Sequence, residues 1–226
     1  MSISLSPALA PAQPFAHASA IDEMELAALI SSKICHDIIG PVGAINNGME
    51  VLDEDDEAQQ RAFALEVIRN STQTASAKLQ FFRFAFGSAG SVGATVDLGN
   101  AEQIARGYVG HNKHKLTWKA FTGQMAKDRV KLLLNLVALG VTALPRGGEI
   151  VAAIRGRIED PAFEVRCIGV GARAPAYLRE FLAQPELVRV DALSVQAYYT
   201  TRLARSAGLR LGFGMDGIDV VLAAVR

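Results

Sequence analysis

The chain has 226 residues, half of them hydrophobic, so it is long enough for one large or two small domains and too apolar to be globally disordered. Lysine plus arginine equals aspartate plus glutamate at 23 each, which gives no reason to expect nucleic-acid binding or an anionic membrane partner. The two cysteines, Cys35 and Cys167, have no spacing typical of a zinc site or a disulfide scaffold, which favours the reducing cytoplasm.

Residues 1–21 are predicted to be a flexible tail. They are rich in alanine, serine and proline, they contain no lysine or arginine, and Pro11 and Pro14 interrupt the apolar run that a signal peptide needs. The most apolar stretch elsewhere, from Leu132 to Leu144, is too short to cross a bilayer. We therefore expect a soluble cytoplasmic protein without a membrane partner.

Residues 22–87 are predicted to form a helical hairpin, with Asp22 capping the first helix. In that helix apolar residues recur at steps of three and four, at Ile38, Val42, Ile45, Met49 and Leu52. A similar seam runs from Leu65 to Phe86, and the acidic run from Asp53 to Glu57 predicts a turn followed by an acidic first turn of the second helix. Because a lone hairpin cannot bury both seams, we expect a homodimer in which two hairpins form a four-helix bundle. The alternative is that the hairpin packs on the rest of its own chain.

Local helix propensity argues against a continuous first helix. Gly40, Gly43 and Gly48 each destabilise a helix by about 1 kcal/mol relative to alanine, and an interior proline such as Pro41 by about 3 kcal/mol. Pro41 also removes the hydrogen bond to the carbonyl of Asp37, so a kink is expected there. Local rules broken in this way often mark a functional site.

Residues 95–226 are predicted to form a second domain of the α+β class. The expected helices span Leu98 to Tyr108, Asp128 to Leu144, Ala176 to Leu182 and Ser194 to Ala207. The expected strands span Leu116 to Phe121, Glu149 to Ile154, Phe163 to Ile168, Leu209 to Phe213 and Ile218 to Val225. Helices followed by paired strands favour an α/β sandwich with one sheet and helices on one of its faces.

His36 lies on the first helix, about 160° around the axis from Ile38 and therefore off the apolar seam. The residues that share its face are small or polar, namely Ser32, Gly40, Gly43 and Asn47. A histidine on such an open face is suited to phosphorylation by a large partner. The alternative is a histidine with no task, and the neighbouring Asp37 and Pro41 favour the phosphoacceptor.

Several neighbours are candidates for supporting roles, each with a plainer alternative. Asp37 either orients the imidazole and tunes its basicity or is an ordinary solvated acid. Lys33, one turn before the histidine, either attracts the incoming phosphoryl group or is an inert surface lysine. Gly40 and Gly43 either clear room for a partner's loop or allow close helix packing, and Asn47 either contacts that partner or nothing.

The His-Asp-x-x-x-Pro motif that begins at His36 resembles the phosphoacceptor box of sensor histidine kinases. Residues 22–87 resemble their dimerisation and phosphotransfer domain, and residues 95–226 resemble their ATP-binding domain. The fuller stretch from Ser32 to Glu50 is more similar still to the ChpT-type histidine phosphotransferases. This resemblance implies a phosphorelay in bacterial cell-cycle control, in which phosphate passes from the receiver domain of the hybrid histidine kinase CckA to the response regulators CtrA and CpdR.

Three departures from the kinase pattern indicate a degenerate ATP-binding domain. When the chain is aligned on Asn135-Leu136, the second asparagine of the kinase box, which helps to hold Mg²⁺, is replaced by Leu139. Cys167 replaces the aspartate that reads adenine, and a thiol does not accept that hydrogen bond as a carboxylate does. The stretch from Val190 to Gln196, where a phosphate loop is expected, contains no glycine.

The resemblance with these departures implies a phosphotransferase that acts through a phosphohistidine and uses no ATP. It implies no cofactor or metal bound by the chain itself, with Mg²⁺ supplied by the acidic pocket of the partner receiver domain. Two other functions stay open: an active ATP-dependent histidine kinase, and a non-catalytic dimeric adaptor in which His36 is incidental. The sequence does not identify the receivers or the direction of phosphate flow.

Overall fold

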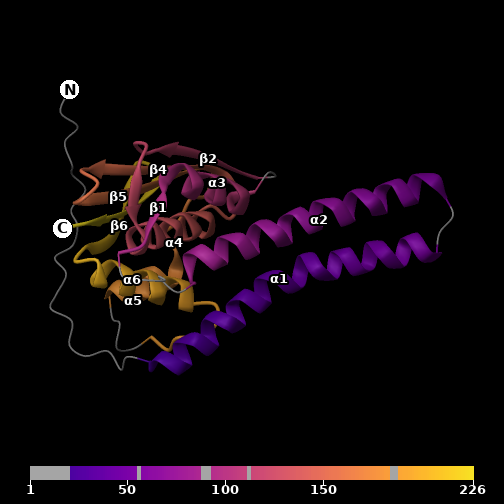
Figure 1. Cartoon of the computed structure of the whole chain (residues 1–226), viewed down its shortest axis with the longest axis horizontal. Helices are drawn as coiled ribbons and strands as arrows, with labels where there is room; N and C mark the ends of the chain where they lie inside the picture. The colour runs from indigo at the N-terminus through magenta and orange to yellow at the C-terminus, as the bar shows by residue number, and fades with distance from the viewer. Residues whose placement is uncertain (1–20, 55–56, 88–92, 111–112, 184–187) are drawn as a thin grey trace.

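The computed structural model describes residues 21–54, 57–87, 93–110, 113–183 and 188–226. The tail predicted over residues 1–21 therefore lies, except for Ile21, outside the described residues. Two long antiparallel helices, α1 (Glu23–Glu54) and α2 (Ala58–Ala85), form a hairpin that projects from the remainder of the chain (Figure 1). The predicted hairpin is thus confirmed, and α1 is continuous through Pro41.

An acidic residue caps the start of α1, whereas no acidic residue caps the start of α2. Asp22 caps α1, because its Oδ1 accepts a hydrogen bond of 2.7 Å from the backbone N–H of Glu25. The acidic first turn predicted for α2 is wrong. Asp53 and Glu54 end α1, Glu57 precedes α2 and makes no side-chain cap, and the first turn of α2 contains no acid.

The apolar seam predicted on α1 is divided between two faces. Ile38 and Ile45 are partly buried, whereas Val42 is 51% exposed and Met49 is 47% exposed. Alternate members of a three-four repeat lie on opposite flanks of the stripe, and the contact with α2 covers one flank alone. Gly48 is buried in that contact and lets the two backbones approach.

The C-terminal part of the chain is one mixed sheet with helices on one face, which confirms the α+β class. The helices are α3 (Leu98–Val109), α4 (Lys127–Ala143), α5 (Ala176–Ala183) and α6 (Val195–Ser206). The strands of the main sheet are, in spatial order, β2 (His114–Lys119), β4 (Gly148–Gly156), β5 (Pro161–Ile168), β7 (Asp219–Val225) and β6 (Arg210–Asp216). The β2–β4 pair is parallel, and the other three pairs are antiparallel.

Two short strands were not predicted. They are β1 (Thr95–Asp97) and β3 (Gln124–Ala126), which pair antiparallel in a separate two-stranded sheet. They lead directly into α3 and α4, and the Asp97 carboxylate caps α3 by accepting a hydrogen bond of 3.0 Å from the N–H of Asn100. This small sheet therefore fixes where the two central helices begin.

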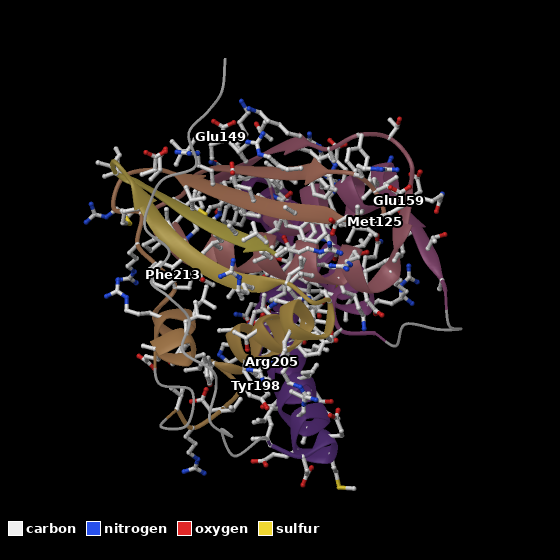
Figure 2. The ribbon with its side chains drawn as sticks, turned by 90° about the vertical axis from the view of Figure 1, so that its left-hand side faces the viewer. Met125, Glu149, Glu159, Tyr198, Arg205 and Phe213 are labelled. Atoms are coloured by element: carbon white, nitrogen blue, oxygen red, sulfur yellow. The ribbon has the colours of Figure 1, made fainter. Side chains whose placement is uncertain are left out.

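The core lies between the main sheet and α4. Alternate residues of β5 and β7 are buried, as expected for strands covered on one face, and every residue of α4 from Val130 to Gly140 is buried. Figure 2 shows this layering from the side, with Phe213 of β6 near α5 and with Tyr198 and Arg205 on α6. The Arg179 guanidinium lies over the Phe213 ring, and Phe181 packs against Tyr198, so α5, α6 and the sheet edge form one unit.

The inner end of the hairpin is anchored in this core. Phe81, Phe82 and Ala85 of α2 are buried and belong to the same apolar cluster as α3, α4 and the sheet. Asn135 of α4, which is fully buried, donates a hydrogen bond of 3.0 Å to the carbonyl of Ala85. The alternative in which the whole hairpin packs on its own chain therefore holds for its inner end, while its outer part extends away (Figure 1).

Among the described helices, α1 is the one that is long and apolar enough to cross a membrane. One such helix is weak evidence for a membrane span, because core helices of soluble proteins and signal sequences satisfy the same test. The helix also carries Lys33, His36 and Asp37 near its middle and packs along α2.

Candidate functional site

His36 stands near the middle of α1 with 70% of its side chain exposed. Its Nδ1 lies 3.2 Å from Oδ1 of Asp37. An ionised carboxylate can only accept a hydrogen bond, so Nδ1 carries the proton in this contact. In the neutral ring, Nε2 then keeps its lone pair, and no described residue forms a hydrogen bond with it. The arrangement presents one nucleophilic nitrogen to solvent.

Asp37 and Lys33 form a close ion pair beside the histidine. The Lys33 Nζ lies 2.6 Å from Oδ2 of Asp37, and each side chain is only 17% exposed. Burial raises the pKa of Asp37, but the hydrogen bond and charge of Lys33, the hydrogen bond of His36 and the charge of Lys78 outweigh it and hold this pKa below its ordinary value. The structure thus places both side chains in a half-buried ion pair rather than free in solvent.

Lys78 and Tyr108 complete the surroundings of Asp37 and were not identified from the sequence. Lys78 of α2 donates a hydrogen bond of 3.0 Å to the backbone carbonyl of Asp37. Tyr108 of α3 is stacked on Phe81, and burial together with the negative charge of Asp37 raises the pKa of its phenol. A usable signal existed for Lys78, because it lies three residues after Ala75 and four before Phe82, on an apolar face of α2 where a charge needs a partner.

The helix face that His36 shares is open over about two turns. A side chain built at Gly40 or Gly43 would meet nothing within 4 Å, and Asn47 is exposed. Gly48 is different, because a Cβ there would lie 2.7 Å from Cγ1 of Ile68. Within the chain, close helix packing therefore explains Gly48, whereas Gly40 and Gly43 leave free space beside the imidazole.

The residues at the kinase-box positions make contacts within the fold. Leu139, which stands where the kinases have their second asparagine, is buried, and so is Asn135. The Nδ2 of Asn135 donates to the carbonyls of Ala85 and Lys131, and its Oδ1 accepts a hydrogen bond of 2.6 Å from Nε2 of Gln196. Cys167 is fully buried on β5, and burial raises the pKa of its thiol to about 12. The Asn135 and Cys167 side chains both lie in the interior of the fold.

The segment where a phosphate loop would be expected uses its own amides. The Asp191 carboxylate accepts hydrogen bonds from the backbone N–H groups of Leu193 and Ser194, and also from the Ser194 hydroxyl. These bonds, led by those from Ser194, hold the pKa of Asp191 below its ordinary value. The amides that would cradle a phosphate at the start of α6 are thus directed to a carboxylate of the chain.

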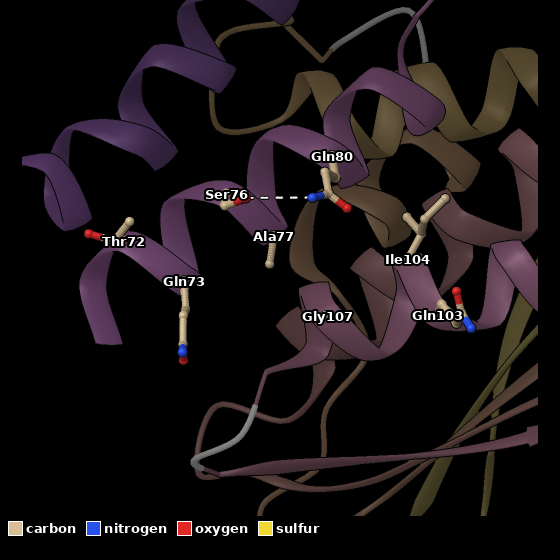
Figure 3. Close-up of a pocket in the computed structure, with 8 residues that line it drawn as sticks. All are labelled: Thr72, Gln73, Ser76, Ala77, Gln80, Gln103, Ile104 and Gly107. Atoms are coloured by element: carbon tan, nitrogen blue, oxygen red, sulfur yellow. Dashed lines mark hydrogen bonds between the residues drawn. The ribbon is translucent and has the colours of Figure 1, made fainter. Parts of the chain in front are cut away.

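A shallow hollow lies beside the hairpin base, and its lining does not resemble a nucleotide site. Figure 3 shows the hollow between α2 and α3, whose lining is entirely uncharged, namely Thr72, Gln73, Ser76, Ala77, Gln80, Gln103, Ile104 and Gly107. Nothing in this lining would offset the charge of phosphate groups. Across the described residues, no group of three or more histidine, cysteine, aspartate and glutamate side chains is arranged to hold a metal ion.

Comparisons with known proteins agree on one family. The family model described as the histidine phosphotransferase C-terminal domain matches residues 98–218. The protein phosphotransferase ChpT of Brucella abortus (strain 2308) is 43% identical over 206 residues, which cover 90% of this chain and 97% of that protein. The 1.7 Å structure of a bacterial phosphotransferase superimposes with a TM-score of 0.82 and 38% sequence identity, over 91% of this chain and 98% of that one.

Proposed function

The chain belongs to the ChpT-type histidine phosphotransferases, and we propose that His36 is the residue that carries the phosphoryl group between receiver domains. The observation that supports this most directly is the geometry of its ring: 70% of the side chain is exposed, and Nδ1 is engaged by Asp37. A phosphoacceptor needs both features, because a folded receiver must reach the nitrogen and the nitrogen must hold a lone pair.

The reaction is a pair of phosphoryl transfers. The lone pair of His36 Nε2 attacks the phosphorus of an aspartyl phosphate, the bond between phosphorus and the aspartate oxygen breaks, and the carboxylate leaves with its electron pair. Throughout the reaction, the Asp37 carboxylate accepts a hydrogen bond from the Nδ1–H group of His36 and stabilises the positive charge that develops on the ring. In the second transfer, the carboxylate of another receiver attacks the phosphorus, and the bond from phosphorus to Nε2 breaks.

We assign roles to the neighbours of His36 from their positions and charges. Lys33 holds the Asp37 carboxylate and places a positive charge beside the path of the phosphoryl group. The open face formed by Gly40, Gly43 and Asn47 is assigned to contact with the receiver. Mg²⁺, which offsets phosphoryl charge in such transfers, is assigned to the acidic pocket of that receiver.

The chain is proposed to act without ATP. The supporting observation is that the asparagine, cysteine and loop amides at the nucleotide positions are all engaged within the fold, as described for Asn135, Cys167 and Asp191. A kinase would need these groups free to bind a nucleotide and its metal. An adaptor without chemistry would not need the hydrogen-bonded arrangement around His36.

The chain is further proposed to act as a homodimer through its hairpin. Large apolar side chains form an exposed row on α1 and α2, namely Ile39, Val42, Met49, Leu65 and Leu79, each between 47% and 69% exposed. On both helices this row is rotated in the same sense from the α1–α2 contact, which in an antiparallel pair puts it on one side of the hairpin. Two such rows, packed together, would bury each other in a four-helix bundle.

The dimer is tested by adding charge to the row. Val42→Glu combined with Leu79→Glu should convert the dimer into a monomer in light scattering after gel filtration, because the bundle would bury four carboxylates. Phe63→Glu is the matched control, since Phe63 is 68% exposed but lies on the opposite side of α2. A double variant with the mass of the wild type would refute this interface.

The biological setting rests on the family. We assign the relay to the cytoplasm and to bacterial cell-cycle control, with the receiver domain of the hybrid kinase CckA as donor and CtrA and CpdR as acceptors. Neither nucleic acid nor membrane is assigned as a partner. Transfer from the phosphorylated CckA receiver at a rate no faster than from an unrelated receiver would count against this setting.

The phosphotransfer itself is tested with two phosphate donors. The purified protein is incubated with γ-labelled ATP alone, and separately with a phosphorylated receiver domain, in both wild-type and His36→Ala forms. We expect label from the receiver only, and none on the variant. Labelling by ATP alone would establish a kinase, and equal labelling of the variant would exclude His36 as the acceptor. No labelling from the receivers supplied would favour the adaptor.

A further inference from the structure

The backbone next to His36 contains a hydrogen-bond acceptor that its own helix cannot satisfy. In an α-helix the carbonyl of residue 37 accepts from the N–H of residue 41, and here residue 41 is proline, which has no N–H. The carbonyl left without a helical partner is that of Asp37, the residue whose side chain holds the imidazole. A loose carbonyl at this point would let the turn that carries both residues change its shape.

Lys78 supplies the missing donor from the other helix. Its Nζ lies 3.0 Å from the Asp37 carbonyl, 41 residues away in the chain. The side chain is partly buried, so the bond is sheltered from water. Asp37 is consequently held at both ends, with its carbonyl bound to Lys78 and its carboxylate bound to Lys33 at 2.6 Å.

We infer that Lys78 is a positioning residue for phosphotransfer: by replacing the hydrogen bond lost at Pro41, it fixes the turn that keeps the Asp37 carboxylate against Nδ1 of His36. Nε2 is then presented with its lone pair toward the receiver. The inference rests on the proposed function, because it assumes that His36 is the phosphoacceptor. It adds a residue of α2 to a site otherwise formed by α1.

The charged and titratable groups around Asp37 come from three helices. Lys33 and His36 belong to α1, Lys78 to α2 and Tyr108 to α3. The two lysines favour the ionised form of Asp37, and this form is the one that accepts a hydrogen bond from Nδ1. Removal of Lys78 should therefore loosen the turn and weaken the contact that selects the Nδ1–H tautomer.

The first test compares Lys78→Met, which keeps the chain length but removes the donor, with Lys78→Arg, which keeps a donor and the charge. Lys119→Met, an exposed lysine on β2, is the charge-matched control. With a phosphorylated receiver as the donor, we expect Lys78→Met to lower kcat about tenfold with KM changed less than twofold, because binding residues are untouched. Lys78→Arg should recover most of the rate, and Lys119→Met should match the wild type.

The second test measures the imidazole directly and needs no receiver. Nitrogen-15 chemical shifts of His36 report which ring nitrogen carries the proton. We expect the Nδ1–H form to predominate in the wild type and in Lys78→Arg, and its share to fall in Lys78→Met. An unchanged tautomer ratio in Lys78→Met would overturn the inference.

The third test separates the carbonyl bond from a general charge effect. Pro41→Ala restores the N–H that the Asp37 carbonyl lacks, so Lys78 should matter less in that background. We expect Lys78→Met to slow transfer about tenfold in the wild type but less than threefold in the Pro41→Ala protein. Equal slowing in both backgrounds would assign Lys78 a purely electrostatic role and refute the inference, whether or not Lys78→Met is also less stable.

These outcomes are distinct from failure of the proposed function. If His36→Ala still accepts phosphate from the receiver, the phosphoacceptor assignment fails. If His36→Ala is inert and Lys78→Met transfers at the wild-type rate, only the role of Lys78 fails.

Discussion

The three glycines of α1 should respond in opposite ways to alanine. An alanine stabilises an exposed helix interior by about 1 kcal/mol relative to glycine, because glycine loses more backbone freedom on folding. At Gly40 and Gly43 the new methyl group meets nothing within 4 Å, so the full gain should appear in the free energy of unfolding. Each variant is therefore expected to be more stable by about 1 kcal/mol.

Gly48 has the same propensity but a different environment. A Cβ there would lie 2.7 Å from Ile68 Cγ1 and 3.3 Å from the carbonyl oxygen of Ala64, so the two helices must separate or Ile68 must leave its rotamer. Overpacking of this kind costs about 1–3 kcal/mol, which cancels or exceeds the gain in propensity. The expected result for Gly48→Ala is a loss of about 0–2 kcal/mol after the gain is subtracted.

Stability and activity should change in opposite directions at the open face. Stability is measured by urea unfolding at one fixed protein concentration, followed by the circular dichroism signal of the helices. Transfer from a phosphorylated receiver measures activity, and Gly40→Ala or Gly43→Ala should raise KM severalfold because the methyl group occupies the space assigned to the receiver. Gly48→Ala serves as the control, since it lies three turns beyond His36. Destabilised Gly40→Ala and Gly43→Ala proteins, or unchanged KM values, would refute this reasoning.

Three further results are expected. The pKa of Asp37 is held below its ordinary value of 3.8, so the contribution of its charge to stability is present above about pH 4 and is lost as the pH falls through the lowered value. The difference in unfolding free energy between the wild type and Asp37→Asn should therefore shrink as the pH falls over that range. A difference that stays constant would contradict this prediction. Asn135→Leu should lower the free energy of unfolding, measured in urea, by about 2–4 kcal/mol, because it leaves the Ala85 carbonyl and the Gln196 amide buried without these partners at about 1–3 kcal/mol each. A loss below about 1 kcal/mol would argue against this hydrogen-bond network. In a Cys35→Ser background, Cys167 should react with a thiol reagent at pH 8 only after unfolding, because burial raises the pKa of its thiol to about 12. Rapid labelling of the native protein would contradict this prediction and show that β5 opens.

Long periodic segments were the predictable part of the fold. The hairpin, α4 and the paired strands β4 and β5 lie close to their expected positions because each repeats its pattern over several turns or residues. β1 and β3 were missed because each has three residues, too few to show a period of two. Their pairing depends on a register between Thr95 and Ala126 that no local pattern encodes.

The helix that carries His36 shows a second limit of prediction from periodicity. Periodicity placed Val42 and Ile38 on one seam, yet only one flank of that seam touches α2, because the pattern records which residues are apolar and not which partner each of them faces. For the same reason, periodicity did not identify Lys78 as part of the site. A lysine inside an apolar rhythm indicates a buried partner, but the partner is a backbone carbonyl orphaned by Pro41 on another helix.

The degenerate nucleotide positions connect the chemistry of the chain to its fold. The last carbonyls of a helix have no partner within that helix, and Asn135 satisfies one of them at the C-terminal end of α2. The Nδ2 of this side chain donates twice, and its Oδ1 accepts a hydrogen bond from Gln196. The asparagine that this chain keeps from the kinase box therefore fastens the hairpin to the C-terminal domain. In this chain, a side chain at one of the nucleotide positions therefore also holds the hairpin carrying His36 in place.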